Sequence, residues 1–362
     1  MTIIDKFFYL LQISLGRKPE QNVDITETEW ATLFEMSEKQ CLAGVLFEGV
    51  KTLSDFYEDL KPPLTLLYEW IGISEQIKRY NMQMNQKSAM IRRVFDRWGL
   101  ESCILKGQGV AQLYPQPELR QSGDIDIWVK GSRGDLVKKL KNNCISLTYI
   151  DYVNCHALFY VDVEVEVHFR PTWMYNPFDN LKVQRWIKSV NDIQMANYDK
   201  DVGFSYPTIS FNLVFSLIHI YRHVFQEGIG LRQLMDYYYI LTHSTEQERY
   251  KAFELLESFG VGKFSSAVMY IMRRVFDVEE TSLLCIPNQK EGEYLLSEIL
   301  RGGNFGYYDD RNKHLSTNRR MKRGVENVKH NFRFIKHYPS EVMWAPAWKI
   351  WHWCWRKWNG DL

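Results

Sequence analysis

The sequence predicts an α+β protein in which a strand-containing core, at residues 101–200, lies between helical regions at residues 1–100 and 201–362. In the two outer regions, apolar residues recur with the spacing of amphipathic helices. In the middle region, apolar and polar residues alternate, as they do in half-buried strands. A chain of 362 residues is long enough for two domains, or for one domain with a large helical extension.

The composition is that of an ordinary globular protein, with 45% hydrophobic and 25% charged residues and a net charge of +1. A charge so close to zero gives no global field that favours nucleic acid. The six cysteines are scattered without a CxxC pair, so we expect neither disulfides nor a thiolate metal site, and a cytoplasmic location. The sequence has no convincing signal peptide and no apolar run long enough to span a membrane.

The sequence of residues 1–100 predicts two long helices. Thr26 and Glu29 form a capping box, and we expect the helix that follows to continue toward Phe47. A second helix is predicted from Leu64 to Trp98, where Gly99 ends it.

A strand at residues 123–129 carries the first candidate site. Aliphatic residues occupy every second position, so Asp124 and Asp126 share the opposite face, roughly 7 Å apart along the strand. Two neighbouring carboxylates repel each other unless a cation offsets the repulsion, and hard oxygen ligands favour Mg²⁺ or Mn²⁺. The alternative is a solvated strand edge with two surface aspartates.

A glycine-containing turn at residues 106–109 follows a short apolar strand and precedes a helical turn. Glycine lets backbone N–H groups approach a ligand, and a helix N-terminus favours an anion. A plain strand-to-helix turn is the alternative interpretation. Further along, Arg120 is expected either to contact the same ligand or to pair with an acid. The candidate nucleotide- or phosphate-binding residues are Lys106, Gly107, Gln108 and Arg120.

Two further strands are predicted at residues 154–160 and 163–169. In the second strand, Glu164, Glu166 and His168 share one face. If this strand lies beside the strand at 123–129, then Glu166 or Glu164 completes a carboxylate triad.

Residues 176–201 are expected to form an irregular polar linker, after which helices begin near Ile209. His219 and His223 have the i, i+4 spacing of a zinc pair, but no accompanying HExxH glutamate, so helix packing is the preferred interpretation. Arg232 and Asp236 have the same spacing and are expected to pair.

The last segment places five tryptophans at helical spacing. We expect this helix to be buried against the helical domain of the same chain; a lipid interface or a partner protein is the alternative. The tryptophans are Trp344, Trp348, Trp351, Trp355 and Trp358.

Taken together, several motifs resemble the uncharacterised bacterial nucleotidyltransferase family of the polymerase-β-like superfamily. The resemblance covers about residues 20 to 240. The motifs are Leu105-Lys106-Gly107, Leu113-Tyr114-Pro115, Arg120, Gly123-Asp124-Ile125-Asp126 and Val165-Glu166-Val167-His168, followed by His223, Gly228, Leu231-Arg232 and Asp236.

The resemblance implies a small mixed β-sheet flanked by helices, with a helical domain that closes a cleft. It implies that Asp124 and Asp126 are the metal-binding pair and that Glu166 is the third carboxylate. Lys106-Gly107 stands where superfamily members usually carry Gly-Ser. The candidate acceptor-side residues are His168, His223, Arg232 and Asp236.

The activity implied is metal-dependent transfer of a nucleoside monophosphate from an NTP, ATP foremost, to an acceptor, with release of pyrophosphate. Mg²⁺ or Mn²⁺ is the expected cofactor. The sequence leaves open whether the acceptor is a small molecule, a protein or RNA, and it does not indicate an oligomeric state. A nucleotide-binding sensor or scaffold without transferase activity is the alternative, and a peripheral-membrane or partner-binding protein is a third hypothesis.

Overall fold

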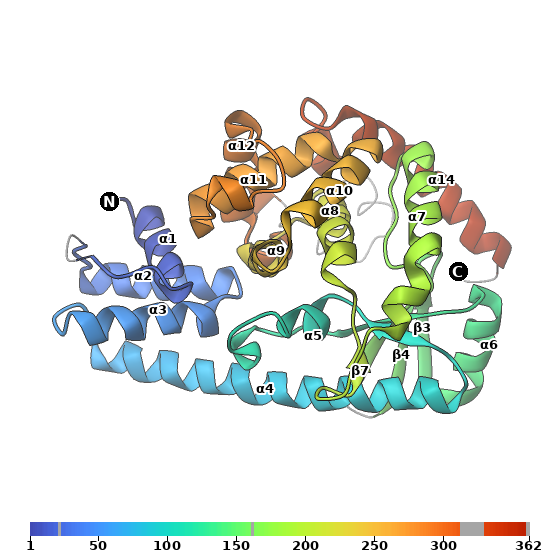
Figure 1. The fold of residues 1–362 in the computed structure, drawn as a ribbon, viewed down its shortest axis with the longest axis horizontal. Helices are drawn as coiled ribbons and strands as arrows, with labels where there is room; N and C mark the ends of the chain where they lie inside the picture. The colour runs from blue at the N-terminus through green and yellow to red at the C-terminus, as the bar shows by residue number, and fades with distance from the viewer. Residues whose placement is uncertain (21–22, 161–162, 312–328, 360–362) are drawn as a thin grey trace.

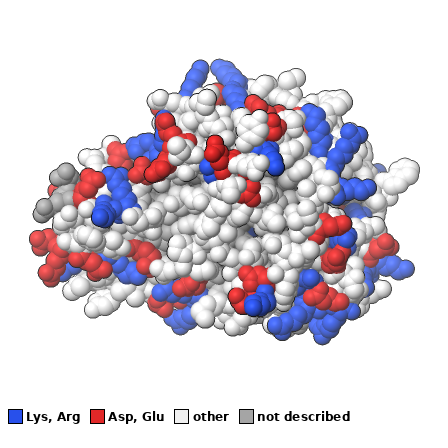
Figure 2. Space-filling view, viewed as in Figure 1, with Lys and Arg blue, Asp and Glu red and all other residues white. Residues whose placement is uncertain are grey.

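The computed structural model describes residues 1–20, 23–160, 163–311 and 329–359. Helices dominate the chain, and one five-stranded sheet lies at one end of the molecule (Figure 1). The α+β class predicted from the sequence is confirmed. Positive and negative side chains are interspersed on the face seen in Figure 2, in keeping with the net charge of +1. No helix in the described ranges is long and apolar enough to cross a membrane.

The N-terminal region is helical, as predicted. Its helices are α1 (Ile3–Ser14), α2 (Glu27–Lys39), α3 (Ala43–Phe56) and α4 (Leu64–Arg97). The expectation that one helix runs from the Thr26 capping box toward Phe47 is wrong, because α2 ends at Lys39. Cys41 adopts a left-handed conformation, with φ of 55°, which breaks the helix. The preceding Gln40 side chain accepts a hydrogen bond from Leu231 N at 2.8 Å, so the break joins this turn to the C-terminal half of the chain.

The strands form a mixed sheet in the order β1-β2-β5-β4-β3, in which only the β2–β5 pair is parallel. The strands are β1 (Ser102–Ile104), β2 (Ile125–Val129), β3 (Ser146–Ile150), β4 (Asn154–Tyr160) and β5 (Val163–His168). The connecting elements are α5 (Lys106–Ala111), the short helix η1 (Pro117–Leu119) and α6 (Arg133–Asn143).

One face of the sheet is apolar and packs on helices. Ile125, Ile127 and Val129 of β2 are buried with Val165 and Val167 of β5, as their alternation predicts. The last turns of α4 and the apolar side of α6 cover them. In Figure 1, α4 runs beneath the whole molecule and ends under the sheet. The polar face therefore looks toward the C-terminal helices.

The C-terminal region is helical, as predicted. Its main helices are α8 (Ile209–Gln226), α9 (Leu231–Thr242), α10 (Glu246–Ser258), α11 (Gly262–Phe276), α12 (Gln289–Gly302) and α14 (Pro339–Asn359), and its short elements are β6 (Tyr198–Asp199), β7 (Phe204–Ser205), η2 (Glu280–Ser282) and η3 (Asn304–Gly306). The N-terminal α1 packs on α11, and Gln12 Nε2 donates to Val275 O at 3.2 Å. Trp128 of β2 stacks on Phe211 of α8, which fixes the sheet against this region.

The expected linker at residues 176–201 is instead mostly the helix α7 (Pro177–Ala196). Asn176 caps it by accepting a hydrogen bond from Phe178 N, and proline occupies the first turn, where its missing N–H costs nothing. Val183 and Ile187 are buried on one side. The sequence did not predict this helix, because few apolar residues occur on its buried side.

The C-terminal α14 contradicts the expectation that its tryptophans are buried against the helical domain. Trp348 stacks on Trp173, which follows β5, with ring centroids 3.9 Å apart. Trp351 and Trp355 contact Tyr152, which precedes β4. The aromatic partners therefore belong to the sheet region and the start of α7. Trp358 is largely exposed, because the helix extends beyond these partners.

A buried ion pair connects the sheet to the helical region. Arg120 donates from Nε to Asp236 Oδ1 and from Nη2 to Oδ2, both at 2.7 Å. Tyr114 donates its hydroxyl to the same carboxylate at 2.7 Å. Asp236 lies on α9, whereas Arg120 precedes β2, so the pair holds the two parts together. Asp236 pairs with Arg120 and not with its i, i−4 neighbour Arg232, whose Nη1 donates to Gln121 O at 2.8 Å.

We predict that Asp236→Ala destabilises the protein by about 3–5 kcal/mol, because it leaves the Arg120 guanidinium buried without its counter-ion. Urea denaturation of the wild type and the variant measures this difference. The matched control is Glu35→Ala, which removes an exposed carboxylate paired with Lys39 and is expected to change stability little. Equal losses in the two variants would contradict the structural role of the buried pair.

Candidate active site

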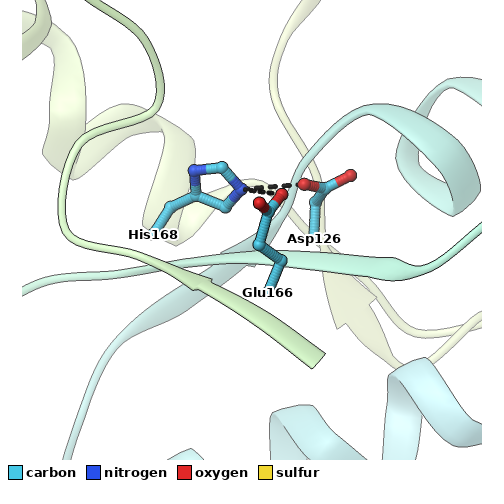
Figure 3. A group of neighbouring side chains, drawn as sticks. All are labelled: Asp126, Glu166 and His168. Atoms are coloured by element: carbon cyan, nitrogen blue, oxygen red, sulfur yellow. Dashed lines mark hydrogen bonds and ion pairs between the residues drawn. The ribbon is translucent and has the colours of Figure 1, made fainter. Parts of the chain in front are cut away.

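The polar face of the sheet brings the predicted carboxylates together through strand register. In the parallel β2–β5 pair, Asp126 lies opposite Glu166, and Trp128 lies opposite His168. Because side chains alternate along a strand, Asp126, Glu166 and His168 all project from the same face. Their ligand atoms lie within 4.8 Å of one another, and among the described residues they are the one group of this kind (Figure 3).

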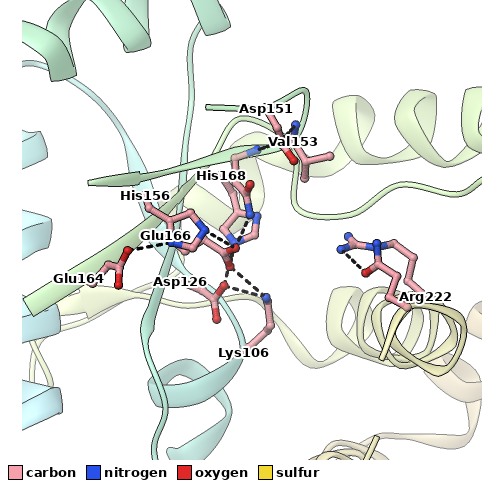
Figure 4. A network of polar contacts seen from close by, with 11 residues as sticks. Lys106, Asp126, Asp151, Val153, His156, Glu164, Glu166, His168 and Arg222 are labelled. Carbon is pink, nitrogen blue, oxygen red and sulfur yellow. Dashed lines mark hydrogen bonds and ion pairs between the residues drawn. The ribbon is translucent and has the colours of Figure 1, made fainter. Parts of the chain in front are cut away.

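Hydrogen bonds tie the three side chains into one cluster. His168 Nε2 lies 2.7 Å from Asp126 Oδ1 and 3.1 Å from Glu166 Oε2. Asn154 of β4 donates to the other oxygen of Glu166. Glu164, the alternative third carboxylate, is largely exposed and bonds to His156 at 3.0 Å (Figure 4). The geometry therefore favours Glu166 over Glu164 as the partner of Asp126.

Lys106 enters this cluster directly. Its Nζ lies 2.7 Å from Asp126 Oδ1 and 3.9 Å from Glu166 Oε2. Leu105 N donates to Asp126 O, which holds the end of β1 on β2, and Lys106 then adopts a left-handed backbone conformation with φ of 45°. Such a conformation is unfavourable for a residue with a Cβ and marks a locally constrained site. The lysine of the turn that the sequence predicts to hold a phosphate lies against the carboxylates.

The other residues of this turn have structural contacts. Gly109 is required by packing, because a Cβ there would lie 2.6 Å from Ile104 O. Gln108 is buried and bonds to Asn81 and Ser122, and it does not line the cavity described below. The expectation that Gln108 contacts a ligand thus finds no support in its position.

A cavity of about 440 Å³ separates the sheet from the helical region. Its sheet wall carries the cluster together with Asp124, which lies just before β2 and is exposed at the opening. Of the predicted site residues, the cavity is lined by Lys106, Gly107, Arg120, Asp124, Asp126, Glu166, His168, His223, Arg232 and Asp236.

The charges in the cluster stabilise one another. Burial alone would raise the pKa of Glu166, but the adjacent His168 and Lys106 hold it well below its usual range. Burial likewise opposes protonation of His168, but Glu166 and Asp126 raise its pKa to about 9. The negative charge of Asp126 raises the pKa of Asp124. At neutral pH two cations therefore face the ionised carboxylates.

The helical wall contains Arg222, which the sequence analysis did not select, together with His219 and His223. Arg222 of α8 lies opposite the carboxylates (Figure 4), with its guanidinium 4.8 Å from the centroid of the Trp173 ring. His219 and His223 contact each other on the same face, and His223 Nδ1 bonds to Glu227 at 2.7 Å. Among the described residues, these two histidines belong to no group of three possible metal ligands. Arg222 is three residues beyond His219, a spacing that marks the same helix face.

Residues 26–277 match the family described as uncharacterised nucleotidyltransferase. No curated protein has a matching sequence. Among solved structures, an antigenic nucleotidyltransferase-like protein from Paracoccidioides brasiliensis matches with 12% identity and a TM-score of 0.35, over 58% of this chain and 96% of that chain.

We predict that metal-free protein loses stability as the pH rises from about 6.5 to about 9. The pKa of His168 is higher in the folded state than in the unfolded state, so its stabilising contribution is complete at low pH and disappears as the folded form deprotonates. The loss is up to about 3 kcal/mol. Urea denaturation in the presence of a chelator, repeated across this pH range, measures it.

His168→Gln should flatten this pH dependence, whereas His243→Gln, which changes a histidine bonded to Tyr239 O outside the cavity, should leave it intact. A pH profile that is the same in all three proteins would show that His168 is not held protonated by the carboxylates.

Proposed function

This chain belongs to the family of uncharacterised nucleotidyltransferases, and we propose that it transfers a nucleoside monophosphate from an NTP to an acceptor with release of pyrophosphate. The observation that carries this proposal is the pairing of Asp126 with Glu166 across parallel strands, beside Asp124, in one cavity. Phosphoryl-group transfer depends mainly on positioning and charge neutralisation, and such a set of carboxylates supplies both through a divalent cation.

The carboxylates suit Mg²⁺ or Mn²⁺ as donor groups. Asp124, Asp126 and Glu166 offer only hard oxygen ligands, and a cation held by them would neutralise the triphosphate. All three carboxylates are assigned to the cation. The acceptor hydroxyl, whose acidity the bound cation would raise, would give its proton to water at the cavity opening.

In the proposed reaction, the acceptor oxygen forms a bond to the α-phosphorus, and the bond from that phosphorus to the bridging oxygen breaks. Pyrophosphate leaves with the bridging oxygen. Lys106, Arg222 and Arg232 are the cations proposed to face the phosphates. The Nε atoms of Arg222 and Arg232 are buried without a hydrogen-bond partner among the described residues, which leaves them available to an anion.

Arg120 and Asp236 receive positioning roles in this proposal, since they pair through two hydrogen bonds. The Nη1 atom of Arg120 has no partner among the described residues, so it is also available to a phosphate. His223 and His168 remain candidates for contacts on the acceptor side. We propose ATP as the preferred NTP and leave the acceptor open among small molecules, proteins and RNA. The free cysteines fit a reaction in the cytoplasm.

A nucleotide-binding sensor is the second candidate, and the Lys106–Asp126 contact favours it. A lysine at 2.7 Å from the carboxylate already compensates part of its charge without a metal. Such a protein would bind nucleotides and transfer nothing.

We predict that NTPs labelled at the α-phosphate transfer their label to an acceptor in cell extract when Mg²⁺ is present, with release of pyrophosphate. Asp126→Asn should lower this transfer by about a hundredfold or more, because it removes a carboxylate from the cation site. The matched control, Asp59→Asn, removes a surface carboxylate near the opposite end of the molecule and should retain full activity.

Transfer that is equal in Asp126→Asn and wild type would contradict the assignment of the site. Calorimetry separates the two candidate functions: nucleotide binding without any label transfer supports the sensor, and binding that is unchanged in the presence of a chelator contradicts a metal-dependent site of either kind.

A further inference from the structure

The outer face of α14 is apolar and exposed to solvent. The exposed fractions are 91% for Trp358, 69% for Met343, 67% for Ile350 and 55% for Trp353. Ala347 and Cys354 are exposed on the same side, with Lys357 as the charged residue among them. Trp344 and Trp351 border this face on one flank and Trp353 borders it on the other. A helix on the surface of a globular protein normally turns its apolar side inward, so this orientation requires an explanation.

Contacts on the inner face of α14 hold the helix in this orientation. Glu341 is buried and accepts hydrogen bonds from Tyr175 N and Asn176 N. Trp348 stacks on Trp173, and Arg133 lies over the Trp355 ring at 4.6 Å. Because polar and aromatic partners fix the inner side, rotation of the helix to bury its outer side would break them.

The neighbouring helix α7 extends the apolar surface and adds positive charge. Phe178, at the start of α7, contacts Trp344, and both Phe178 and Leu181 are exposed. Three exposed basic residues follow on α7: Lys182, Arg185 and Lys188. Lysine and arginine side chains are visible along the edge of the molecule in Figure 2 where α7 and α14 lie in Figure 1.

Acidic groups are few among the described residues of this surface. Within α14, Glu341 is the single acid, and it is buried. On α7, Asp179 is half-buried and bonded to Asn176 and Lys182, and the exposed Asp192, near the other end of the helix, is paired with Lys130. The exposed surface therefore combines tryptophans and aliphatic side chains with basic residues.

We propose that α14 and the start of α7 form a docking surface for an anionic lipid bilayer, on which α14 lies in the interface plane. Tryptophan is favoured at the boundary between headgroups and acyl chains, and basic residues at the same level attract anionic headgroups. The finding that no described helix is long and apolar enough to cross a membrane is compatible with this arrangement, because α14 lies on the bilayer and does not span it.

Charge favours a bilayer over a second copy of the chain. A two-fold interface places the same patch on both subunits, so the basic residues of α7 and Lys357 would meet a patch of the same positive charge. Like charges brought together cost stability. An anionic surface offers the opposite charge to all of them.

Sedimentation of the full-length protein with lipid vesicles tests this proposal. We expect binding to vesicles of phosphatidylcholine mixed with phosphatidylglycerol, weaker binding to phosphatidylcholine alone, and a shift of tryptophan fluorescence to shorter wavelength on binding. The double variant Ile350→Glu/Trp353→Glu should weaken binding to the mixed vesicles about tenfold or more, because it removes apolar area and adds negative charge. The double variant Arg185→Gln/Lys188→Gln should weaken binding to the mixed vesicles and leave binding to phosphatidylcholine alone unchanged.

The matched control is Tyr68→Glu/Tyr250→Glu, which alters exposed aromatic residues on α4 and α10 and should bind like the wild type. Thermal melting checks that each variant is folded. Two results would overturn the proposal: wild-type protein that stays in solution with both kinds of vesicle, or light scattering that shows a dimer in the wild type and a monomer in Ile350→Glu/Trp353→Glu. The second result would assign the face to self-association.

Discussion

The ion cluster formed by Lys106 and His168 with Asp126 and Glu166 is the interaction on which the site depends. Buried carboxylates are costly unless cations and hydrogen bonds compensate them. Three strands and one turn supply the groups of this cluster. The acids lie on β2 and β5, Asn154 lies on β4, and Lys106 lies in the turn that follows β1. The parallel register of β2 and β5 therefore determines both the chemistry and the local electrostatics.

Other buried contacts fix the helical wall of the cavity relative to the sheet. The Arg120–Asp236 pair joins the approach to β2 with α9, while Trp128 packs on α8. Trp173 links the cavity to the molecular surface, because Arg222 lies over its ring and Trp348 of α14 stacks on it. The helix α14 and the cavity wall that carries Arg222 therefore contact the same aromatic residue, Trp173. We propose that this wall faces the nucleotide.

Much of the site was predictable, because strand alternation is a local property. It aligned Glu166 with His168 on one face, but the choice of Glu166 over Glu164 needed the inter-strand register, which no local pattern contains. Asp124 lies just before β2 and lines the same cavity, and it is not part of the close group of Asp126, Glu166 and His168. The helix α7 was missed because its few buried residues give a weak period, and its cap at Asn176 went unrecognised. For α14, the tryptophan spacing predicted a helix correctly but not its partners, since those depend on tertiary packing.

A crystal structure with Mn²⁺ and a non-hydrolysable NTP analogue tests the central claim most directly, because anomalous scattering locates the metal. We predict an anomalous peak between the oxygens of Asp124, Asp126 and Glu166, with the triphosphate beside it and Lys106 turned toward the phosphates. Two results would contradict the account. One is binding of the analogue outside the cavity. The other is a crystal that shows no anomalous peak at the carboxylates, with Lys106 still in contact with Asp126.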